Sequence, residues 1–477
     1  MIRTRVLFFV LVVTVVGLTT GAGVGYADTQ ADAPYYLEAI ASITGGDVGQ
    51  HVSIAFNENT GKPYVSYYDE TNQDLRLIYP HDTAGNCGPD NNWYCEVLDT
   101  TGDVGQYSSI DYFIDSGTGA VKIGIAYYDA TNHDLKVAIW SASPFPGWKV
   151  SRVNAEPLIG SYRQCGRYAS LKFDSNGAVH IAYVVHLDAI NPLPDSYHAM
   201  HAYSVSSGGD CGYGAAAGKW QCDAISSNEF DLPSSTSLDL TSTGEPNVAF
   251  YDDSTDNLRF CQKDAGTWSC RTIESTGGSG AQVFVSLAVD QADRPHIAYY
   301  DYFNGKLKYA TWVGTAGNCG LDGATYEFQC DAIDTIGDSQ SRVGISVDVD
   351  PDGYPVIAYQ DDSDPLGFSV LNVARPALAH GTTIGNCGPI VNLFRRWQCE
   401  TIDDATQGGG AGHLYEAEYA ALGIDPDGAA YIAYYEEDDY NNEGRLKLAH
   451  QEVADPIFSD DFETGGVSAW SSSVGGS

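Results

Sequence analysis

Histidine side chains gather in one short part of the chain. Four of the eleven histidines lie between positions 180 and 201. They are His180, His186, His198 and His201. Histidine is the side chain most often used for general acid–base catalysis, because its ordinary pKa lies near neutral pH. This cluster is therefore the first place to look for a reaction.

Two tyrosines beside these histidines complete a candidate catalytic set. His186 or His198 would be the general base, as in a polysaccharide lyase or a glycosidase. Tyr183 or Tyr197 would be the acid. However, His198 and His201 are an odd number of residues apart, so on a regular strand they would face opposite sides. We favour the alternative, in which this segment is a decorated loop or a binding pocket.

Three aspartates could hold a metal ion. Asp348, Asp350 and Asp352, followed by Gly353, match the opening of a calcium-binding loop. The bidentate acid that such loops need further along is not at the expected offset. Calcium is the one cofactor that the sequence suggests, and a plain turn is the default interpretation.

A phrase ending in Tyr-Asp supplies aromatic and hydrogen-bonding groups at intervals along the chain. It is a β-branched residue, Ala or Ser, and Tyr or Phe, usually followed by Tyr-Asp, and it occurs seven times. The copies begin at Val65, Ile125, Ile181, Val248, Ile297, Ile357 and Ile432. Repeated groups of this kind favour multivalent binding of a glycan or a surface protein. The candidate ligand-binding residues are Tyr68, Asp69, Tyr128, Asp129, Tyr251, Asp252, Tyr300 and Asp301.

The acid of this phrase also has a purely structural interpretation. An aspartate at the end of a strand can accept backbone N–H bonds from the turn that follows. Because it recurs in copy after copy, we expect this structural role to account for it, whereas an enzyme needs one set of catalytic carboxylates.

The spacing of the copies predicts the elements that position these groups. The copies are about 60 residues apart, a length that suits a four-stranded propeller blade. In the fifth copy, the expected strands are 285–289, 295–300, 306–310 and 328–333. Turn residues separate them, and no stretch has a helical period. The linkers between copies, such as Gly102 to Gln106, would then share one face with the Tyr-Asp turns.

The two ends of the chain predict a closed ring. Residues 36–40 and the linker after them resemble the fourth strand and linker of the first copy, residues 94–106. The last copy has three strands and no fourth. We therefore predict an all-β, seven-bladed β-propeller whose N-terminal strand completes the last blade, which removes an open sheet edge.

Ten of the eleven cysteines form five local pairs, one pair in each of five copies. The pairs are Cys87/Cys95, Cys211/Cys222, Cys261/Cys270, Cys319/Cys330 and Cys387/Cys399. Zinc would need clustered ligands, whereas these pairs are spread along the chain, so disulfides that each staple a hairpin of two adjacent strands are expected. Cys165 is left over, either buried or available for an intermolecular link.

The N-terminus predicts secretion. A basic start, an apolar run from Val6 to Leu18 and small residues before Ala27 describe a signal segment over 1–27. An uncleaved anchor is the alternative. The propeller would span 28–453. The segment 454–477 has too few apolar residues for a domain, so we expect a disordered tail or a sorting segment.

The charge excludes one class of partner. The formal net charge is −39, with 24 Lys plus Arg against 63 Asp plus Glu. A chain this acidic repels phosphate backbones, so no nucleic acid partner is expected. We expect a monomer without a stable membrane anchor after signal cleavage.

The phrase from Pro295 to Asp301, with residues 304–310 after it, resembles a repeat of secreted bacterial β-propellers. These are loosely grouped with the sialidase-like superfamily, and the resemblance covers nearly all of residues 36–450. It implies the propeller fold. It implies no sialidase activity, because the Ser-x-Asp-x-Gly-x-Thr-Trp box of sialidases is absent.

Together these patterns predict a secreted, non-catalytic binding module for extracellular polysaccharide or a cell-surface protein. The alternative is a carbohydrate-active enzyme, a lyase or a glycosidase, with its site near the third blade. A structural component of a cell-surface layer is a third hypothesis.

Overall fold

The computed structural model describes residues 34–451 apart from short segments. These segments are 44–45, 82–84, 143–145, 155–162, 188–195, 227–234, 253, 276–283, 323–324, 338–343, 364–368, 380–383, 392–393, 405–413 and 439–442. The predicted signal segment and the predicted tail lie outside the described residues. In the part of the chain that is described, no helix is long and apolar enough to cross a membrane.

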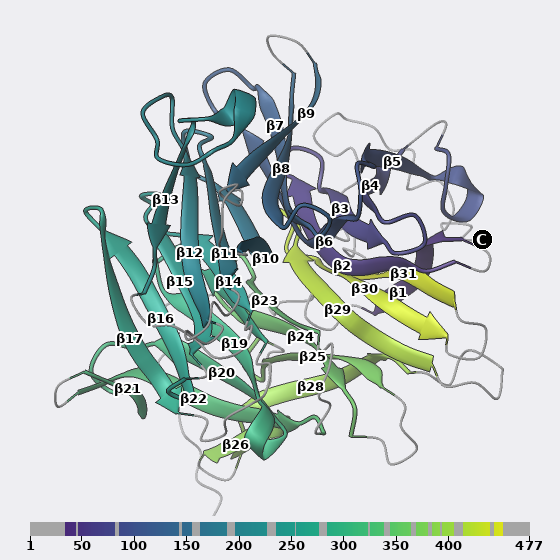
Figure 1. Ribbon diagram of the computed structural model, residues 1–477. Coiled ribbons are helices and arrows are strands. Elements are labelled where there is room, and N and C mark those ends of the chain that lie inside the picture. The colour runs from purple at the N-terminus through teal and green to yellow at the C-terminus, as the bar shows by residue number, and fades with distance from the viewer. Residues whose placement is uncertain are drawn as a thin grey trace, which may run out of the picture.

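Seven antiparallel sheets are arranged as blades around a central axis (Figure 1). Blade 1 has β2 (Val48–Asn57), β3 (Lys62–Asp69), β4 (Asp74–Pro80) and β5 (Trp93–Asp99). Blade 2 has β6 (Val104–Ile114), β7 (Val121–Asp129), β8 (Asp134–Ser141) and β9 (Gly147–Asn154). Blade 3 has β10 (Arg163–Phe173), β11 (Val179–Leu187), β12 (Ser196–Ser204) and β13 (Trp220–Ala224). Blade 4 has β14 (Thr236–Leu240), β15 (Pro246–Asp252), β16 (Asn257–Asp264) and β17 (Thr267–Ser275).

The last three blades follow the same order. Blade 5 has β18 (Val285–Val289), β19 (Pro295–Asp301), β20 (Lys306–Trp312), β22 (Thr325–Thr335) and, at its edge, β21 (Cys319–Asp322). Blade 6 has β23 (Ile345–Val349), β24 (Pro355–Asp361), β25 (Val370–Pro376), β28 (Trp397–Asp403), β26 (Gly385–Val391) and β27 (Phe394–Arg395). Blade 7 has β29 (Leu414–Ile424), β30 (Ala430–Asp438), β31 (Glu443–Gln451) and β1 (Tyr35–Ser42). Three short 3-10 helices are η1 (Pro89–Asn91), η2 (Gly214–Ala216) and η3 (Tyr302–Asn304).

The seven-bladed architecture and its closure by the N-terminal strand are confirmed. Strand β1 pairs antiparallel with β31, with Leu37 opposite Ala449 and Ala41 opposite Leu446. Figure 1 shows the purple β1 beside the yellow C-terminal strands. The ring therefore closes by hydrogen bonds between the two ends of the described chain, as in other propellers that remove their open edge.

The second strand of each blade lies in the middle of the packing. Every residue of β15 and of β19 is buried. Both faces of such a strand meet a neighbouring blade, and the small Ala or Ser of each phrase lets that blade approach closely. The expected pattern of apolar residues on both faces is thus confirmed, and the blades are held by packing on either side.

A belt of serines ties each innermost strand to the next blade. Six innermost strands place a serine hydroxyl that accepts a hydrogen bond from a backbone N–H of the following blade, at 2.9–3.1 Å. This serine belt consists of Ser53, Ser109, Ser170, Ser237, Ser286 and Ser346. At the junction of blades 7 and 1 the equivalent residue is Ala421, which has no hydroxyl, and there β1 supplies the closure.

In every second blade, an aspartate two residues after the belt serine accepts a further hydrogen bond from the next blade. Asp111 accepts the N–H of Phe173, and Asp239 accepts the N–H of Val289, both at 2.7 Å. Asp348 in blade 6 makes the equivalent bond to blade 7 at 2.8 Å. Inner strands of neighbouring blades lie too far apart for a sheet ladder, so these side chains satisfy backbone donors that face the channel.

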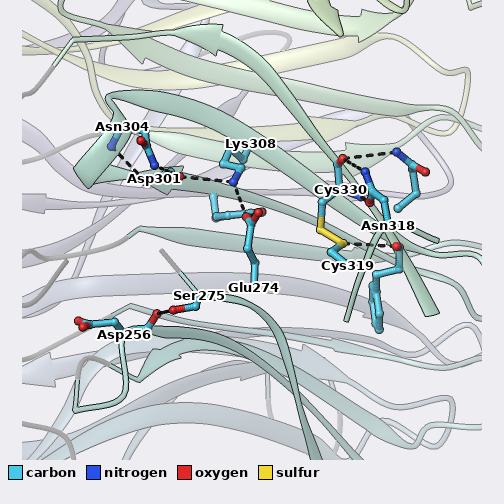
Figure 2. Close-up of polar contacts among 12 residues, drawn as sticks. Asp256, Glu274, Ser275, Asp301, Asn304, Lys308, Asn318, Cys319 and Cys330 are labelled. Atoms are coloured by element: carbon cyan, nitrogen blue, oxygen red, sulfur yellow. Dashed lines mark hydrogen bonds and ion pairs between the residues drawn. A yellow bond between two sulfur atoms is a disulfide. The ribbon is translucent and has the colours of Figure 1, made fainter. Parts of the chain in front are cut away.

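Further from the central axis, a buried tyrosine and an acidic side chain join neighbouring blades, a contact here called the clamp. The first tyrosine of the phrase donates to an acid at the end of the previous blade, as Tyr299 does to Glu274. Lys308 neutralises this acid and also lies 3.4 Å from Asp301 (Figure 2). The same set recurs in other blades, as Tyr127/Asp99/Lys136 and Tyr434/Asp403/Lys447. Each clamp joins a hydrogen bond and an ion pair across the interface between two blades.

All five predicted disulfides are formed. They are Cys87–Cys95, Cys211–Cys222, Cys261–Cys270, Cys319–Cys330 and Cys387–Cys399. The second cysteine of every pair lies on the outer strand of its blade and is partly exposed, at Cys95, Cys222, Cys270, Cys330 and Cys399. The pairing is thus confirmed, one disulfide in each of five blades.

The expectation that each disulfide staples two adjacent strands is correct for three of the five pairs. Cys261 and Cys270 lie directly opposite each other on β16 and β17, Cys319–Cys330 joins β21 to β22, and Cys387–Cys399 joins β26 to β28. In every pair but Cys261–Cys270, the first cysteine lies in the segment between the third strand of the blade and the strand that holds the second cysteine. Cys87, for example, is bonded to Cys95 of β5 from outside the strands of its blade. The physical reason is that this segment folds back along the outer strand, so the disulfide ties the segment to the edge of the blade.

Side chains next to the disulfides support the same contact. In four of the hairpins, an Asn or Asp side chain just before the first cysteine accepts the backbone N–H of the second. In blade 6, Asn386 accepts the N–H of Cys399 at 2.7 Å. Figure 2 shows the equivalent contact between Asn318 and Cys330. The segment that folds back is therefore held by a hydrogen bond as well as by the disulfide.

The eleventh cysteine is not part of a disulfide. Cys165 is fully buried in the inner strand of blade 3. In this fold it is therefore not at a surface where it could link to another chain.

The clamp in Figure 2 yields a stability prediction. Lys308→Met leaves Glu274 and Asp301 facing each other in a largely buried place without a cation. Removing one partner of a buried ion pair leaves the other charge buried and unpaired. We therefore expect the free energy of unfolding to fall by roughly 2–4 kcal/mol. Denaturant unfolding measures this.

The matched control is Lys306→Met, at the start of the same strand. Its ammonium donates to Thr335 at the surface, so we expect a change within about 0.5 kcal/mol. Equal losses in the two variants would contradict the clamp.

Candidate functional site

The predicted ligand-binding residues are buried. The eight side chains, Tyr68, Asp69, Tyr128, Asp129, Tyr251, Asp252, Tyr300 and Asp301, are at most 4 % exposed. The aspartates accept hydrogen bonds within the next turn, as Asp69 does from the backbone N–H and the amide of Asn72. Asp129 and Asp301 do the same with Asn132 and Asn304. The expected turn-capping role of the acid is confirmed, and its ligand-binding role stays a prediction.

The second tyrosine of the phrase holds the linkers between blades. The hydroxyl of Tyr68 donates to Asp103 at 2.9 Å, and that of Tyr300 donates to the carbonyl of Gly337 at 2.7 Å. Both acceptors lie in the linker that follows the blade. The turns after the second strands and the linkers therefore share one face of the ring, here called the linker face.

The linker predicted over Gly102 to Gln106 is partly strand. β6 begins at Val104, and a register shift follows on each side of Gln106. Gly105 has φ 111°, and a Cβ there would lie 2.8 Å from the Cα of Leu75 in blade 1. Only glycine can bring the backbone this close at such a φ. The bulged strand β6 therefore begins within the predicted linker, and this part of the strand packs directly on the preceding blade.

This double bulge occurs in four consecutive blades and exposes one aromatic side chain in each. The inner strands β29, β2, β6 and β10 are 10 or 11 residues long, and all four carry the register shifts. Two residues before the belt position stand Tyr419, His51, Tyr107 and Tyr168. Each has φ between 51° and 54°. A left-handed backbone at bulky residues costs energy, and residues strained in this way cluster at functional sites.

These four side chains form a continuous row, here called the aromatic arc. Neighbouring ring centroids are 4.4–4.6 Å apart, from Tyr419 through His51 and Tyr107 to Tyr168. All four residues are partly exposed. The row follows blades 7, 1, 2 and 3 around the axis at the linker end of the inner strands.

Further groups lie behind the arc. Tyr68 and Tyr128 contact His51 and Tyr107 at 6.1 and 6.3 Å between ring centroids. The guanidinium of Arg167 lies 5.6 Å from the ring of Tyr128. The Nε of Arg167 is buried and has no hydrogen-bond acceptor among the described residues. The arc thus combines a row of rings, each tilted by 48–54° to the next, with a cationic donor.

The sequence contains a signal for this arc. In each of the four blades an aromatic residue stands two positions before the small belt residue, as in Tyr107-Ser108-Ser109. Three of the blades also have a glycine two positions before the aromatic residue, as Gly49 precedes His51. The residues of the Tyr-Asp phrase lie one layer deeper than the arc.

The candidate catalytic residues of blade 3 are divided between two faces. His186 and Tyr197 pair across β11 and β12, and their rings stack at 4.2 Å. Tyr183 and His198 are each an odd number of positions from these, so they face the opposite blade. Tyr183 is fully buried and accepts a hydrogen bond from Asn154 of blade 2 at 2.7 Å, the equivalent of the clamp. The catalytic role of these residues stays a prediction.

The candidate calcium ligands do not converge. Asp348 lines the central channel, whereas Asp350 accepts the N–H groups of Asp352 and Tyr354 in the turn that follows. Among the described residues, the three carboxylates form no cluster of the size that a metal ion needs. Asp210 does lie beside Cys211 and Cys222, but these sulfurs form a disulfide and offer no thiolate. Calcium binding stays untested.

Among the described residues that line the central channel, one side chain is basic and several are carboxylates. The cavity of about 540 Å³ is lined by the serine belt and by Asp111, Asp239, Asp348 and Lys172. Asp239, then Asp111 and Asp348, hold the pKa of Lys172 above its ordinary value. Burial raises the pKa of Asp111 and of Asp348. The Lys172 ammonium therefore offsets part of the negative charge of the three carboxylates that accept hydrogen bonds between blades.

Comparisons with known proteins give no family. No family model and no curated protein matches the sequence. The resemblance to sialidase-like propellers therefore stays a prediction.

Several solved structures are remotely similar. AofleA from Arthrobotrys oligospora is 9% identical, with 79% of this chain and 95% of that chain covered and a TM-score of 0.40. A fucose-specific lectin from Aleuria aurantia is 11% identical over 78% and 100%, with a TM-score of 0.39. The α-L-arabinofuranosidase Arb93A from Fusarium graminearum is 10% identical over 87% and 96%, with a TM-score of 0.40. At this distance none of them bears on what this chain binds.

Two stacked histidines in blade 3 predict an acid-dependent loss of stability. His180 and His201 lie 3.1 Å apart between Nδ1 and Nε2, next to Tyr203, with the charged Lys263 nearby. Burial lowers the pKa of His180 to about 4. Burial, then His180 and Lys263, lowers the pKa of His201 well below its ordinary value.

Between pH 6.5 and 4, the unfolded chain therefore binds protons that the folded protein does not. We expect the free energy of unfolding to fall as the pH drops through this range. The loss from His180 alone is on the order of 3 kcal/mol, at about 1.4 kcal/mol per pKa unit. His201→Phe keeps a ring against Trp268 and removes one proton site, so its loss is smaller. Denaturant unfolding at several pH values measures this, and an equal loss in both proteins would contradict it.

Proposed function

We propose that this protein is a secreted, non-catalytic binding module for extracellular polysaccharide, and that the aromatic arc is its main contact surface. The observation that supports this most is the unbroken row of four partly exposed rings, each on a strained left-handed backbone. Isolated surface aromatics are common, but a built and strained row across four blades needs a reason.

Sugar rings suit this surface for a physical reason. The C–H face of a pyranose carries a slight positive charge and packs against the negative face of an aromatic ring. Successive rings from Tyr419 to Tyr168 offer several such faces along a curve, so a chain of sugars gains avidity. Arg167 adds a hydrogen-bond donor for a hydroxyl group beside them. The predicted residues Tyr68 and Tyr128 would act behind the arc by holding His51 and Tyr107 in place.

Charge narrows the class of polysaccharide. With a net charge of −39, the protein repels polyanions at a distance. A neutral polysaccharide is therefore a better ligand than a uronic-acid polymer or a sulfated one. Five disulfides are typical of proteins that act in an oxidising compartment, which supports an extracellular location.

Binding is favoured over catalysis because of how the candidate groups are arranged. A general acid and a general base must reach one substrate bond from suitable distances. His186 stacks on Tyr197, and Tyr183 is already bonded to Asn154 in the core. A cell-surface protein as the ligand would need a broader contact surface than one curved row of four rings.

The test replaces one ring of the arc. Tyr107→Asn removes the aromatic face and puts a residue that tolerates φ near 54° in its place. We expect affinity for the preferred neutral polysaccharide to fall at least about tenfold, as for other buried anchors of a binding surface. Stability should change by no more than about 1 kcal/mol, because relief of strain offsets the lost packing. A panel of neutral and acidic polysaccharides, with affinity measured by calorimetry, provides the data.

Tyr213→Ala is the control, since Tyr213 is an exposed aromatic residue outside the arc. Its affinity should equal that of the unmodified protein. Unchanged affinity in Tyr107→Asn would contradict the proposal. If the unmodified protein cleaved a polysaccharide and released new sugar ends, and His186→Ala abolished this cleavage, the enzymatic alternative would replace the proposal.

A further inference from the structure

A groove between blades 4 and 5 has the features of a second ligand site. It lies on the opposite side of the ring from the linker face, where β15 and β19 begin and β16 and β20 end. Its volume is about 460 Å³, within the usual range for small-molecule sites. We call it the blade groove.

A buried side-chain amide lines this groove, and its oxygen accepts no hydrogen bond from the described residues. Asn247, at the start of β15, is 1 % exposed and lines the cavity. Its Oδ1 has no hydrogen-bond partner among the described residues. A buried acceptor without a donor costs roughly 1–3 kcal/mol, so this position is explained if a ligand supplies the donor.

The groove also has a polar row beside this amide. Gln262 lies opposite Asn247, and Ser269 lies opposite Gln262, so the three cross the sheet of blade 4 side by side. Both Gln262 and Ser269 are exposed. They offer donors and acceptors to the rim of a ligand whose inner edge reaches Asn247.

An exposed indole forms the facing wall. Trp312, on β20 of blade 5, is 42 % exposed and lines the groove. Phe260 and Phe328 contact each other edge to face at 5.8 Å and form an apolar floor. A flat aromatic wall opposite a row of amide and hydroxyl groups fits a ring-shaped ligand that has an apolar face and a polar edge.

The charges in the groove select against anions. Asp264 and Asp293 line it, and its cation, Arg271, is already paired with Glu327. Asp293 is held by the backbone N–H and hydroxyl of Ser242. The remaining field is negative, so a neutral ligand fits better than a carboxylate or phosphate.

We propose that the blade groove is a second carbohydrate site, which holds one neutral pyranose unit between Trp312 and Asn247. A sugar hydroxyl donates to Asn247 Oδ1, and the C–H face of the ring packs on the indole. This inference rests on the proposed function for the class of ligand, but on separate residues. A second site on the far side of the ring lets one molecule join two polysaccharide chains.

The experiment uses 5-fluorotryptophan labelling and ¹⁹F NMR of the full chain. Eight tryptophans give eight signals, and Trp312→Phe assigns one of them to the groove. The probes are the methyl pyranosides of glucose, galactose and mannose at millimolar concentrations. We expect at least one of them to shift the Trp312 signal in a saturable manner.

Three variants test the mechanism. Asn247→Leu and Gln262→Ala should each weaken this titration, the former about tenfold, the loss expected for one buried hydrogen bond. Gln262 is exposed, so its variant does not depend on a change in the core. Phe303→Ala, an exposed aromatic at the other end of blade 5, should leave the titration unchanged.

The outcomes separate this inference from the proposed function. A Trp312 shift that persists in Tyr107→Asn and is lost in Asn247→Leu supports the blade groove as a separate site. A Trp312 signal that no probe moves, or that moves equally in Asn247→Leu, overturns the inference, while polysaccharide binding at the arc is judged by its own calorimetry. Loss of the shift in Tyr107→Asn would also overturn it, because the sites would not be separate.

Discussion

The fold depends on hydrogen bonds that leave one blade and end on the next. In each of six blades, a serine hydroxyl on the innermost strand accepts a backbone N–H of the neighbouring inner strand. The innermost strands surround the channel, and on that side no neighbouring strand is close enough to pair with their backbone N–H groups. Without these acceptors, backbone donors would face the channel unpaired, a cost of roughly 1–3 kcal/mol each. The belt therefore fixes the angle and spacing of the blades.

The outer contacts add to this frame, and the candidate site depends on it. Tyrosine, acid and lysine clamps such as Tyr299, Glu274 and Lys308 prevent neighbouring blades from sliding. On that rigid base, the bulges of four inner strands can hold His51 and its three counterparts at φ values that a flexible loop would relax. The aromatic arc is thus a consequence of blade geometry, because each arc residue stands two positions before the belt position on its inner strand.

The repeat made the fold predictable, because a phrase such as Ile297 to Asp301 must be buried on both faces in every blade. Local cysteine spacing gave the disulfide pairs, but not the way in which most of them tie a folded-back segment to the outer strand. The site was harder to predict, because a tyrosine looks the same in sequence whether its hydroxyl clamps a blade, as in Tyr127, or its ring is exposed, as in Tyr107. Only the bulges separate these roles, and a bulge shifts which face a residue occupies. The groove residues Asn247 and Trp312 lie in different blades, and no local pattern joins them.

Native-state hydrogen exchange resolved to single amides tests the central claim most directly. The amides bonded to the serine belt, for example those of Ile110, Leu171 and Leu287, should exchange only when the whole ring unfolds, with a common free energy. The amide of Ile54, whose neighbour across the closing junction is Ala421, should exchange faster. If the belt amides exchanged through local opening, as fast as amides of the outermost strands, blades would not be held by the belt and this account of the ring would be wrong.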